Sequence, residues 1–176
     1  QGFVTGDRMG IYIVDYADGN KPGTLTAYDN RANNMLYTFD ANGNCWNSKG
    51  EIYWRDETTP IDVYGYYPGV NTISDVNAYA FEVEADQSIA ASDGNISSYE
   101  ASDFLWGKAT KVTPTSETVT ITYYHRLAGV QVQLAMGTGL TEVEWEKLPK
   151  TVLVENTVRT ADIDLSTGFV SRRGET

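Results

Sequence analysis

The sequence predicts an all-β protein: a two-sheet, mostly antiparallel β-sandwich or flattened barrel of seven to nine strands. Short runs rich in β-branched and aromatic residues recur along the 176 residues, separated by clusters of Gly, Asn, Asp and Pro. Apolar and polar residues alternate in 118–122 and 130–134, which predicts one face in a core and one in water. Many short strands with turns between them are typical of sandwiches and barrels.

The predicted strands are bounded by turn residues in chain order. The run 61–67 is the clearest, because a proline stands at each end, Pro60 and Pro68, and proline has no N–H to give to a ladder. The full set of predicted strands is 9–16, 35–39, 52–54, 61–67, 79–84, 118–124, 127–136, 151–154 and 161–165.

Evidence for helices is thin. The segment 96–102 could form a turn or two. The segment 140–148 is ambiguous, but a strand is favoured because Val143 and Trp145 would point one way and Glu142, Glu144 and Glu146 the other, toward water. The segments 15–24 and 85–99 are unusually polar and are predicted to be surface loops.

Length and composition indicate one globular domain. A chain of this length can bury a sizeable core, and 41% hydrophobic with 12% aromatic residues is not the composition of a disordered protein. The core is predicted from the apolar strand positions. Its expected members are Val63, Tyr67, Phe104, Leu105, Trp106, Ile121, Leu127, Val130, Val132 and Leu134.

Charge and cysteine content exclude several classes of function. A net charge of −11 makes nucleic acid and anionic lipid poor partners. Cys45 is the only cysteine, so the chain can form no internal disulfide and no cysteine-based zinc site. No apolar run is long enough to span a bilayer as a helix, and no signal peptide opens the chain.

Candidate sites for chemistry are few. Residues 40–51 place oxygen side chains as in a calcium loop, but Cys45 replaces the glycine of the sharp turn and strands flank it, so an Asn/Gly-rich hairpin connection is favoured. His125 is the sole histidine, and no nucleophile motif supports it as a catalytic residue. Sugar stacking on Trp46, Tyr53 and Trp54 is less expected than strand packing. We therefore predict no catalytic residue, no metal, no cofactor and no enzymatic activity.

Five segments resemble the N-terminal domain of the fimbrillin-like proteins of Bacteroidales, in the family's order. The last, Thr-Ala-Asp-Ile-Asp-Leu-Ser-Thr-Gly at 160–168, ends a resemblance that covers nearly the whole chain. The others are Gly-Asp-Arg at 6–8, Asp-Val-Tyr-Gly-Tyr-Tyr-Pro at 62–68, Ser-Asp-Phe-Leu-Trp-Gly at 102–107 and His-Arg-Leu at 125–127.

This resemblance implies a transthyretin-like topology and one N-terminal β domain over 1–176, with a second β domain downstream. It also implies an exported outer-membrane lipoprotein, with leader and lipid-bearing cysteine upstream, that serves as a fimbrial (pilus) subunit or adhesion protein. Its expected partners are other fimbrial subunits, joined by strand donation, and a host surface protein or glycan. The fragment alone is expected to be a monomer or at most a weak dimer. The alternative is a carbohydrate-binding surface module of a glycan-uptake system.

Overall fold

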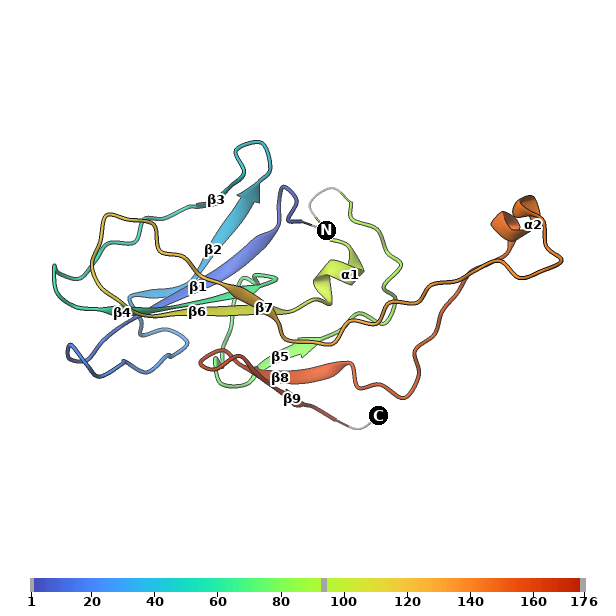
Figure 1. Cartoon of the computed structure of the whole chain (residues 1–176). Coiled ribbons are helices and arrows are strands. Elements are labelled where there is room, and N and C mark those ends of the chain that lie inside the picture. Colours follow the sequence, from blue (N-terminus) through green and yellow to red (C-terminus); the bar gives the residue numbers. More distant parts are fainter. Residues whose placement is uncertain (1, 93–94, 175–176) are drawn as a thin grey trace.

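The computed structural model describes residues 2–92 and 95–174 and folds them into two antiparallel sheets (Figure 1). The larger sheet has the order β3-β2-β1-β4-β6-β7 and the smaller the order β5-β8-β9. The strands are β1 Arg8–Asp15, β2 Ala32–Asp40, β3 Cys45–Ser48, β4 Ile61–Tyr67, β5 Tyr79–Glu82, β6 Leu105–Val112, β7 Tyr123–His125, β8 Thr160–Asp164 and β9 Phe169–Arg172. The predicted all-β, two-sheet class is confirmed, and the transthyretin-like topology stays a prediction.

The paired strands β1 and β4 form the centre of the larger sheet and are apolar on both faces. Tyr12 pairs with Tyr64 on one face, and Ile13 pairs with Val63 on the other. All seven residues of β4 are buried. A strand covered on both faces needs an almost continuous apolar run, which explains the composition of 61–67.

The main core fills the space between the two sheets. Phe104 is fully buried there, and its ring centroid lies 5.1 Å from that of Phe81. The indole Nε1 of Trp106 donates a hydrogen bond of 2.8 Å to the carbonyl of Leu165, and this bond ties the larger sheet to the end of β8. Aromatic packing and this bond therefore hold the two layers together.

A buried ion pair explains how an aspartate is tolerated in β4. Asp62 is 1% exposed, and its Oδ2 lies 2.9 Å from the Nζ of Lys108 on the neighbouring strand. Its Oδ1 accepts the backbone N–H of Lys111 at 2.9 Å. The register between β4 and β6 shifts here, and Lys111 has a φ of 50°, as expected of a β-bulge. The carboxylate thus satisfies the backbone group that the bulge releases.

Buried tyrosines make the stability of the fold sensitive to alkaline pH. Burial, with a smaller contribution from Tyr28, raises the pKa of Tyr12 to about 12, and burial also raises the pKa of Tyr66, Tyr67 and Tyr123. In the unfolded chain these phenols ionise near pH ~10. Below that pH the phenols are neutral in both states, and the stability that their burial contributes is fully present. As the pH rises toward the folded-state pKa, the unfolded chain ionises first and this stability is lost.

We expect the free energy of unfolding to fall above pH ~10 by as much as about 1.4 kcal/mol per pH unit for each such tyrosine. Urea denaturation at a series of alkaline pH values, with phenolate absorbance as a second signal, measures this. A free energy of unfolding that stays constant to pH ~11 would contradict it.

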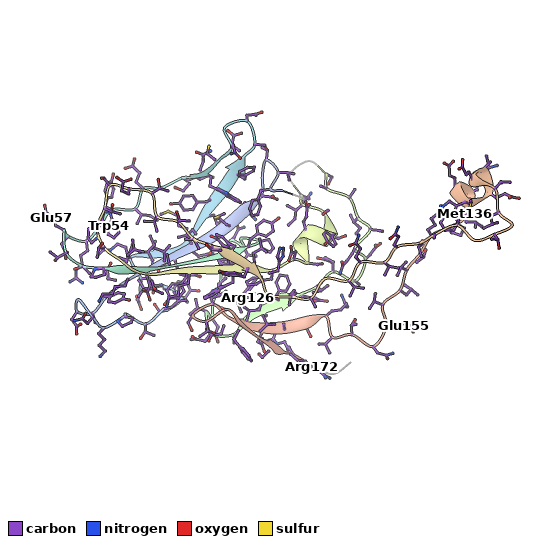
Figure 2. The ribbon with its side chains drawn as sticks, viewed as in Figure 1. Trp54, Glu57, Arg126, Met136, Glu155 and Arg172 are labelled. Carbon is purple, nitrogen blue, oxygen red and sulfur yellow. The ribbon has the colours of Figure 1, made fainter. Side chains whose placement is uncertain are left out.

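The region after β7 departs most from prediction. Residues 128–157 form an arm that projects from the two sheets, and the short helix α2, Glu142–Lys147, lies at its tip (Figure 1). Met136 and Glu155 lie on the two limbs of the arm, far from Trp54 at the other end of the molecule (Figure 2). The predicted strands 127–136 and 151–154 are therefore wrong, because in the described residues neither limb lies in a ladder.

The predicted core is right in the body and wrong in the arm. Val63, Tyr67, Phe104 and Trp106 are buried, whereas Leu105, Ile121 and Leu127 are half-buried. The three arm residues predicted to be buried are exposed by 69% at Val130, 49% at Val132 and 48% at Leu134. Alternation of apolar and polar residues predicts a buried strand face only where another layer covers that face, and no layer covers the arm in the described residues.

The predicted strand at 140–148 is also wrong, because α2 is stabilised locally. Thr141 caps the helix by accepting from the backbone N–H of Glu144, whose side chain accepts in return from the N–H of Thr141. This reciprocal capping box satisfies backbone donors that a short helix would leave free. The predicted turn at 96–102 is confirmed by α1, Ser98–Ala101. Prediction missed β3, β6 and β9, and residues 52–54 lie outside any strand.

Candidate functional site

An apolar groove lies on the face of the larger sheet opposite the main core. Its floor consists of Met9, Ile11 and Ile13 of β1 with Ile61 and Val63 of β4. These odd-numbered side chains point away from the second sheet because successive strand residues alternate between faces. The groove encloses about 600 Å³, a volume within the range of ligand pockets.

Two connections form the walls of the groove. Residues 49–60 lead from β3 to β4, and residues 113–122 lead from β6 to β7; both rise on the same side of the sheet (Figure 1). The indole Nε1 of Trp54 in the first connection donates to the carbonyl of Thr115 in the second at 3.2 Å. This bond places the connections at one end of the groove, where Figure 2 shows Trp54.

Tyr123 closes the groove at the side of β7. Its hydroxyl lies 3.3 Å from the Sδ of Met9, after the ring crosses over Gly65 in β4. A Cβ at position 65 would overlap that hydroxyl, so only glycine permits the ring to lie there. The glycine in the motif 62–68 therefore has a packing role.

The second wall carries a strand-like segment without a partner strand. Val119 and Ile121 are half-buried along the groove, while Thr118, Thr120 and Thr122 are exposed. Within the described residues, the backbone of 113–121 belongs to no ladder and makes no hydrogen bond to another backbone group. Residues 114, 116 and 117 are in bends, and the part that follows them, 118–121, presents N–H and C=O groups to an incoming chain.

The two ends of the groove differ in chemistry. At the Met9 end the ring of Phe3 packs edge-on against Trp46, with centroids 4.9 Å apart, and lies 5.4 Å from Tyr67. At the Ile13 end the lining includes Arg31 and Arg55. One end is therefore aromatic and the other is charged.

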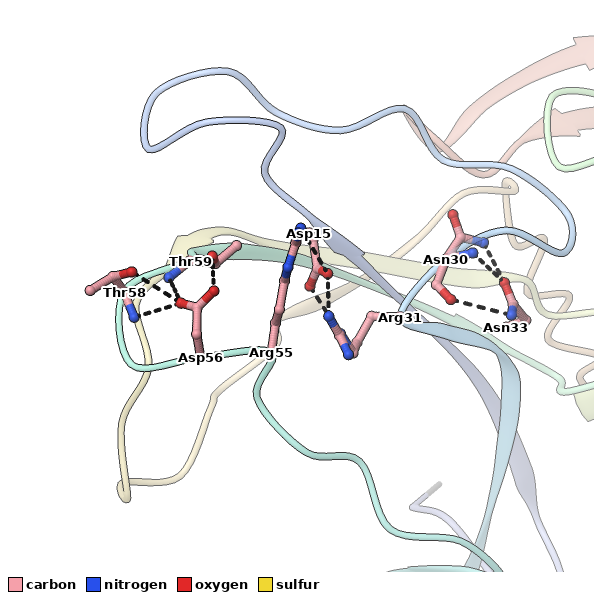
Figure 3. Close-up of polar contacts among 8 residues, drawn as sticks. All are labelled: Asp15, Asn30, Arg31, Asn33, Arg55, Asp56, Thr58 and Thr59. Atoms are coloured by element: carbon pink, nitrogen blue, oxygen red, sulfur yellow. Dashed lines mark hydrogen bonds and ion pairs between the residues drawn. The ribbon is translucent and has the colours of Figure 1, made fainter.

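Hydrogen bonds fix the charged end (Figure 3). Asp15 accepts two bonds from the guanidinium of Arg31, at 3.1 and 2.5 Å, and this pairing raises the pKa of Arg31. Arg55 reaches the same carboxylate only at 4.0 Å. The neighbouring Asp56 points toward residues of its own loop. Hydrogen bonds donated by Thr59, and also by Thr58, lower the pKa of its carboxyl group.

Comparison with known proteins identifies the family. The model of the fimbrillin-like family matches residues 1–176. This chain belongs to the fimbrillin-like family. A crystal structure of a "putative cell adhesion protein" from Bacteroides uniformis ATCC 8492 superposes with a TM-score of 0.63 at 21% sequence identity. The match covers 99% of this chain and 62% of the other, so the chain spans less than two thirds of that protein's length. No curated protein matches the chain.

The calcium-loop candidate of this fimbrillin-like chain is a hairpin connection, as favoured from the sequence. Asp40 pairs with Cys45 where β2 meets β3, and Asn44 takes a φ of 47° in the turn. The described residues contain no group of three or more His, Cys, Asp or Glu side chains placed to hold a metal ion. None of the described helices is long and apolar enough to cross a bilayer.

The other singled-out residues lie apart from one another. His125 is on the exposed edge strand β7, and its Nδ1 lies 2.8 Å from the Oδ1 of Asp103. Glu144 caps α2 instead of lining a strand, which corrects the expectation for the row 142–146. By contrast, Trp46, Tyr53 and Trp54 all line the groove, Tyr53 at 70% exposure.

Sequence reasoning missed the groove, although one signal for it was present. The alternation in 118–122 is that signal. The predicted strand 118–124 is wrong for most of its length, because only β7, Tyr123–His125, is a strand and residues 118–122 lie unpaired beside an apolar floor. No pattern in the sequence indicates that residues 49–60 form the opposite wall, because that placement depends on contacts such as the one between Trp54 and Thr115.

Proposed function

We propose that this chain is a structural subunit of a cell-surface fimbria, or an associated adhesion protein, that accepts a β-strand from a partner subunit in the groove. Membership of the fimbrillin-like family supports the fimbrial role. The structural similarity to the B. uniformis protein, which is named a "putative cell adhesion protein", supports an adhesion role. The proposal includes export to the outer membrane as a lipoprotein, a second β domain downstream of this one, and a host protein or glycan as a further partner. It assigns the protein no catalytic role.

One observation supports the acceptance of a strand: the apolar groove lies beside a backbone segment that belongs to no ladder. An added strand gains affinity from main-chain hydrogen bonds and specificity from alternate side chains that enter pockets. Here residues 118–121 offer the backbone groups, and Met9, Ile11 and Ile13 offer an apolar floor at alternate positions of one strand. The net charge of −11 disfavours uncontrolled association of free subunits, so joining needs a fitting strand.

The test combines light scattering with peptide binding. The protein alone should stay a monomer, or at most a weak dimer, as its concentration rises. A synthetic peptide of alternating Val and Thr should bind it, with a change in tryptophan fluorescence because Trp46 and Trp54 line the groove.

Val119→Asp should abolish this binding, because it places a carboxylate in the apolar wall without a partner. Thr120→Asp is the matched control, since it adds the same charge one residue away on the exposed side and should leave binding intact. Filaments formed by the protein alone, or equal binding by the two variants, would refute strand acceptance.

A carbohydrate-binding module is the second candidate, favoured by the three aromatic residues in the groove, Trp46, Tyr53 and Trp54. Two of these rings have other partners: Trp46 packs against Phe3, and Trp54 bonds to Thr115. Tyr53 is the most exposed of the three and would be the stacking platform. Glycan-array binding lost in Tyr53→Ala, with peptide binding unchanged, would favour this function.

A further inference from the structure

The lining of the groove is close to neutral in a strongly acidic protein, because Arg31 is paired with Asp15 and Glu117 balances Arg55. Its charged lining residues are Arg31, Arg55 and Glu117, although the chain as a whole carries −11. Arg31 is neutralised by its two bonds to Asp15. The groove is therefore a place where an anionic group meets less repulsion than on most of this surface.

Arg55 is the groove-lining cation whose guanidinium N–H groups are available to bind an anion. Its side chain is 58% exposed, and within the described residues its ion pair is the one at 4.0 Å to Asp15, which Arg31 already occupies. In the part of the chain that the structure describes, Asp56 accepts bonds from Thr58 and Thr59 and forms no ion pair with Arg55. A guanidinium has five N–H donors arranged to grip a carboxylate.

The unpaired wall gives the groove a direction. Residue Thr115 contacts Trp54, the neighbour of Arg55, whereas Tyr123 contacts Met9 at the other end. The segment 115–123 thus runs from the Arg55 end to the Met9 end. A strand that pairs with it antiparallel, the more frequent arrangement, runs the opposite way and reaches Arg55 at its C-terminal end.

We propose that Arg55 selects the incoming strand: the groove takes an extended peptide with apolar side chains at alternate positions and an acidic side chain at the C-terminal end of that stretch. This inference rests on the proposed strand acceptance and adds the charge and orientation of the partner. An acidic side chain is assigned in preference to a terminal carboxylate, because the Arg55 side chain is 58% exposed and its partner need not be the buried end of a strand.

The experiment compares acetylated and amidated peptides of alternating Val and Thr. About eight residues suffice, since Met9 to Ile13 spans roughly 13 Å at ~3.3 Å per residue. One peptide has Glu at its last position, a second has Glu at its first, and a third has Gln at its last. A fourth has Gln last and a free terminal carboxylate. Binding is followed by tryptophan fluorescence at low and high salt.

We expect the C-terminal Glu peptide to bind about three- to fivefold more tightly than its Gln counterpart at low salt, with the difference shrinking at high salt. The N-terminal Glu peptide should show no such gain. Arg55→Gln should remove the preference, so that this variant binds the C-terminal Glu peptide and its Gln counterpart with equal affinity. Arg159→Gln is the control, because this exposed arginine pairs with Glu82 on the smaller sheet.

The outcomes separate the two proposals. If all four peptides bind with equal affinity, the groove accepts strands but Arg55 does not select them, and this inference is wrong. A preference only for the N-terminal Glu peptide overturns the orientation, and one only for the free terminal carboxylate overturns the assigned anion. If no peptide binds, the strand-accepting function itself fails.

Discussion

Phe104→Ala should lower the free energy of unfolding by about 3–5 kcal/mol, the range for deleting a buried phenylalanine. The ring is fully buried between the sheets and lies among three other rings, with centroids at 5.1 Å from Phe81, 6.0 Å from Tyr79 and 6.2 Å from Tyr66. Tyr66 comes from β4, Tyr79 and Phe81 from β5, and Phe104 directly precedes β6, so the neighbours cannot close the cavity without shifting both sheets. Urea denaturation should show a lower midpoint at an unchanged m-value.

Val132→Ala is the matched control for this prediction. The alternation in 130–134 predicts a buried Val132, whose truncation would cost about 2 kcal/mol or more. The structure exposes 49% of this side chain on the arm, so we now expect a change within about 0.5 kcal/mol. A large loss at Val132 would show that another layer covers the arm in solution.

Gly168→Ala should produce the second large loss of stability. Gly168 lies in the turn between β8 and β9 with a φ of 71°, where a Cβ costs about 1–2 kcal/mol. The added atom would also lie 2.5 Å from the indole of Trp106, and such overpacking costs about 1–3 kcal/mol. The indole cannot retreat freely, because Arg126 stacks on it at 4.6 Å and its Nε1 is bonded to Leu165.

Gly6→Ala separates the two causes. Gly6 has a φ of 100°, but no atom lies within 4 Å of the Cβ that alanine would add. It should therefore show the backbone cost alone, and Gly168→Ala should be the more damaging substitution in thermal or urea unfolding. Equal losses in the two variants would mean that Trp106 moves aside without cost.

The sequence predicts the body of this fold well because the signals there are local. Pro60 and Pro68 bound β4, and the composition of the run between them demands burial. The strands β6 and β9 were missed, since their apolar residues are interrupted by Gly, Lys and Ser and gain strand structure only from a neighbour. Propensity is weak where pairing decides.

The candidate site was predictable only in fragments. The alternation around Val119 and Ile121 indicates a strand, and Trp46 and Trp54 stand out as aromatics. That these residues face one groove depends on two connections meeting over β1 and β4, which no local pattern encodes. The Thr-x-x-Glu spacing of Thr141 and Glu144 is the sequence signature of a capping box and indicates the start of α2, a signal that the alternation in 142–146 obscures.

The pairing within the smaller sheet bears on the order of folding. Tyr79 of β5 pairs with Ile163 of β8. During synthesis, β5 therefore has no neighbour to pair with until most of the second half of the chain has been translated. Such non-local contacts slow folding and leave a nascent strand open to wrong partners in the meantime. The strand β5 has only four residues, and the exposed carboxylates of Glu82 and Glu84 follow its apolar part. Shortness and charge are features that restrain an unpaired strand from aggregating before its proper neighbour arrives.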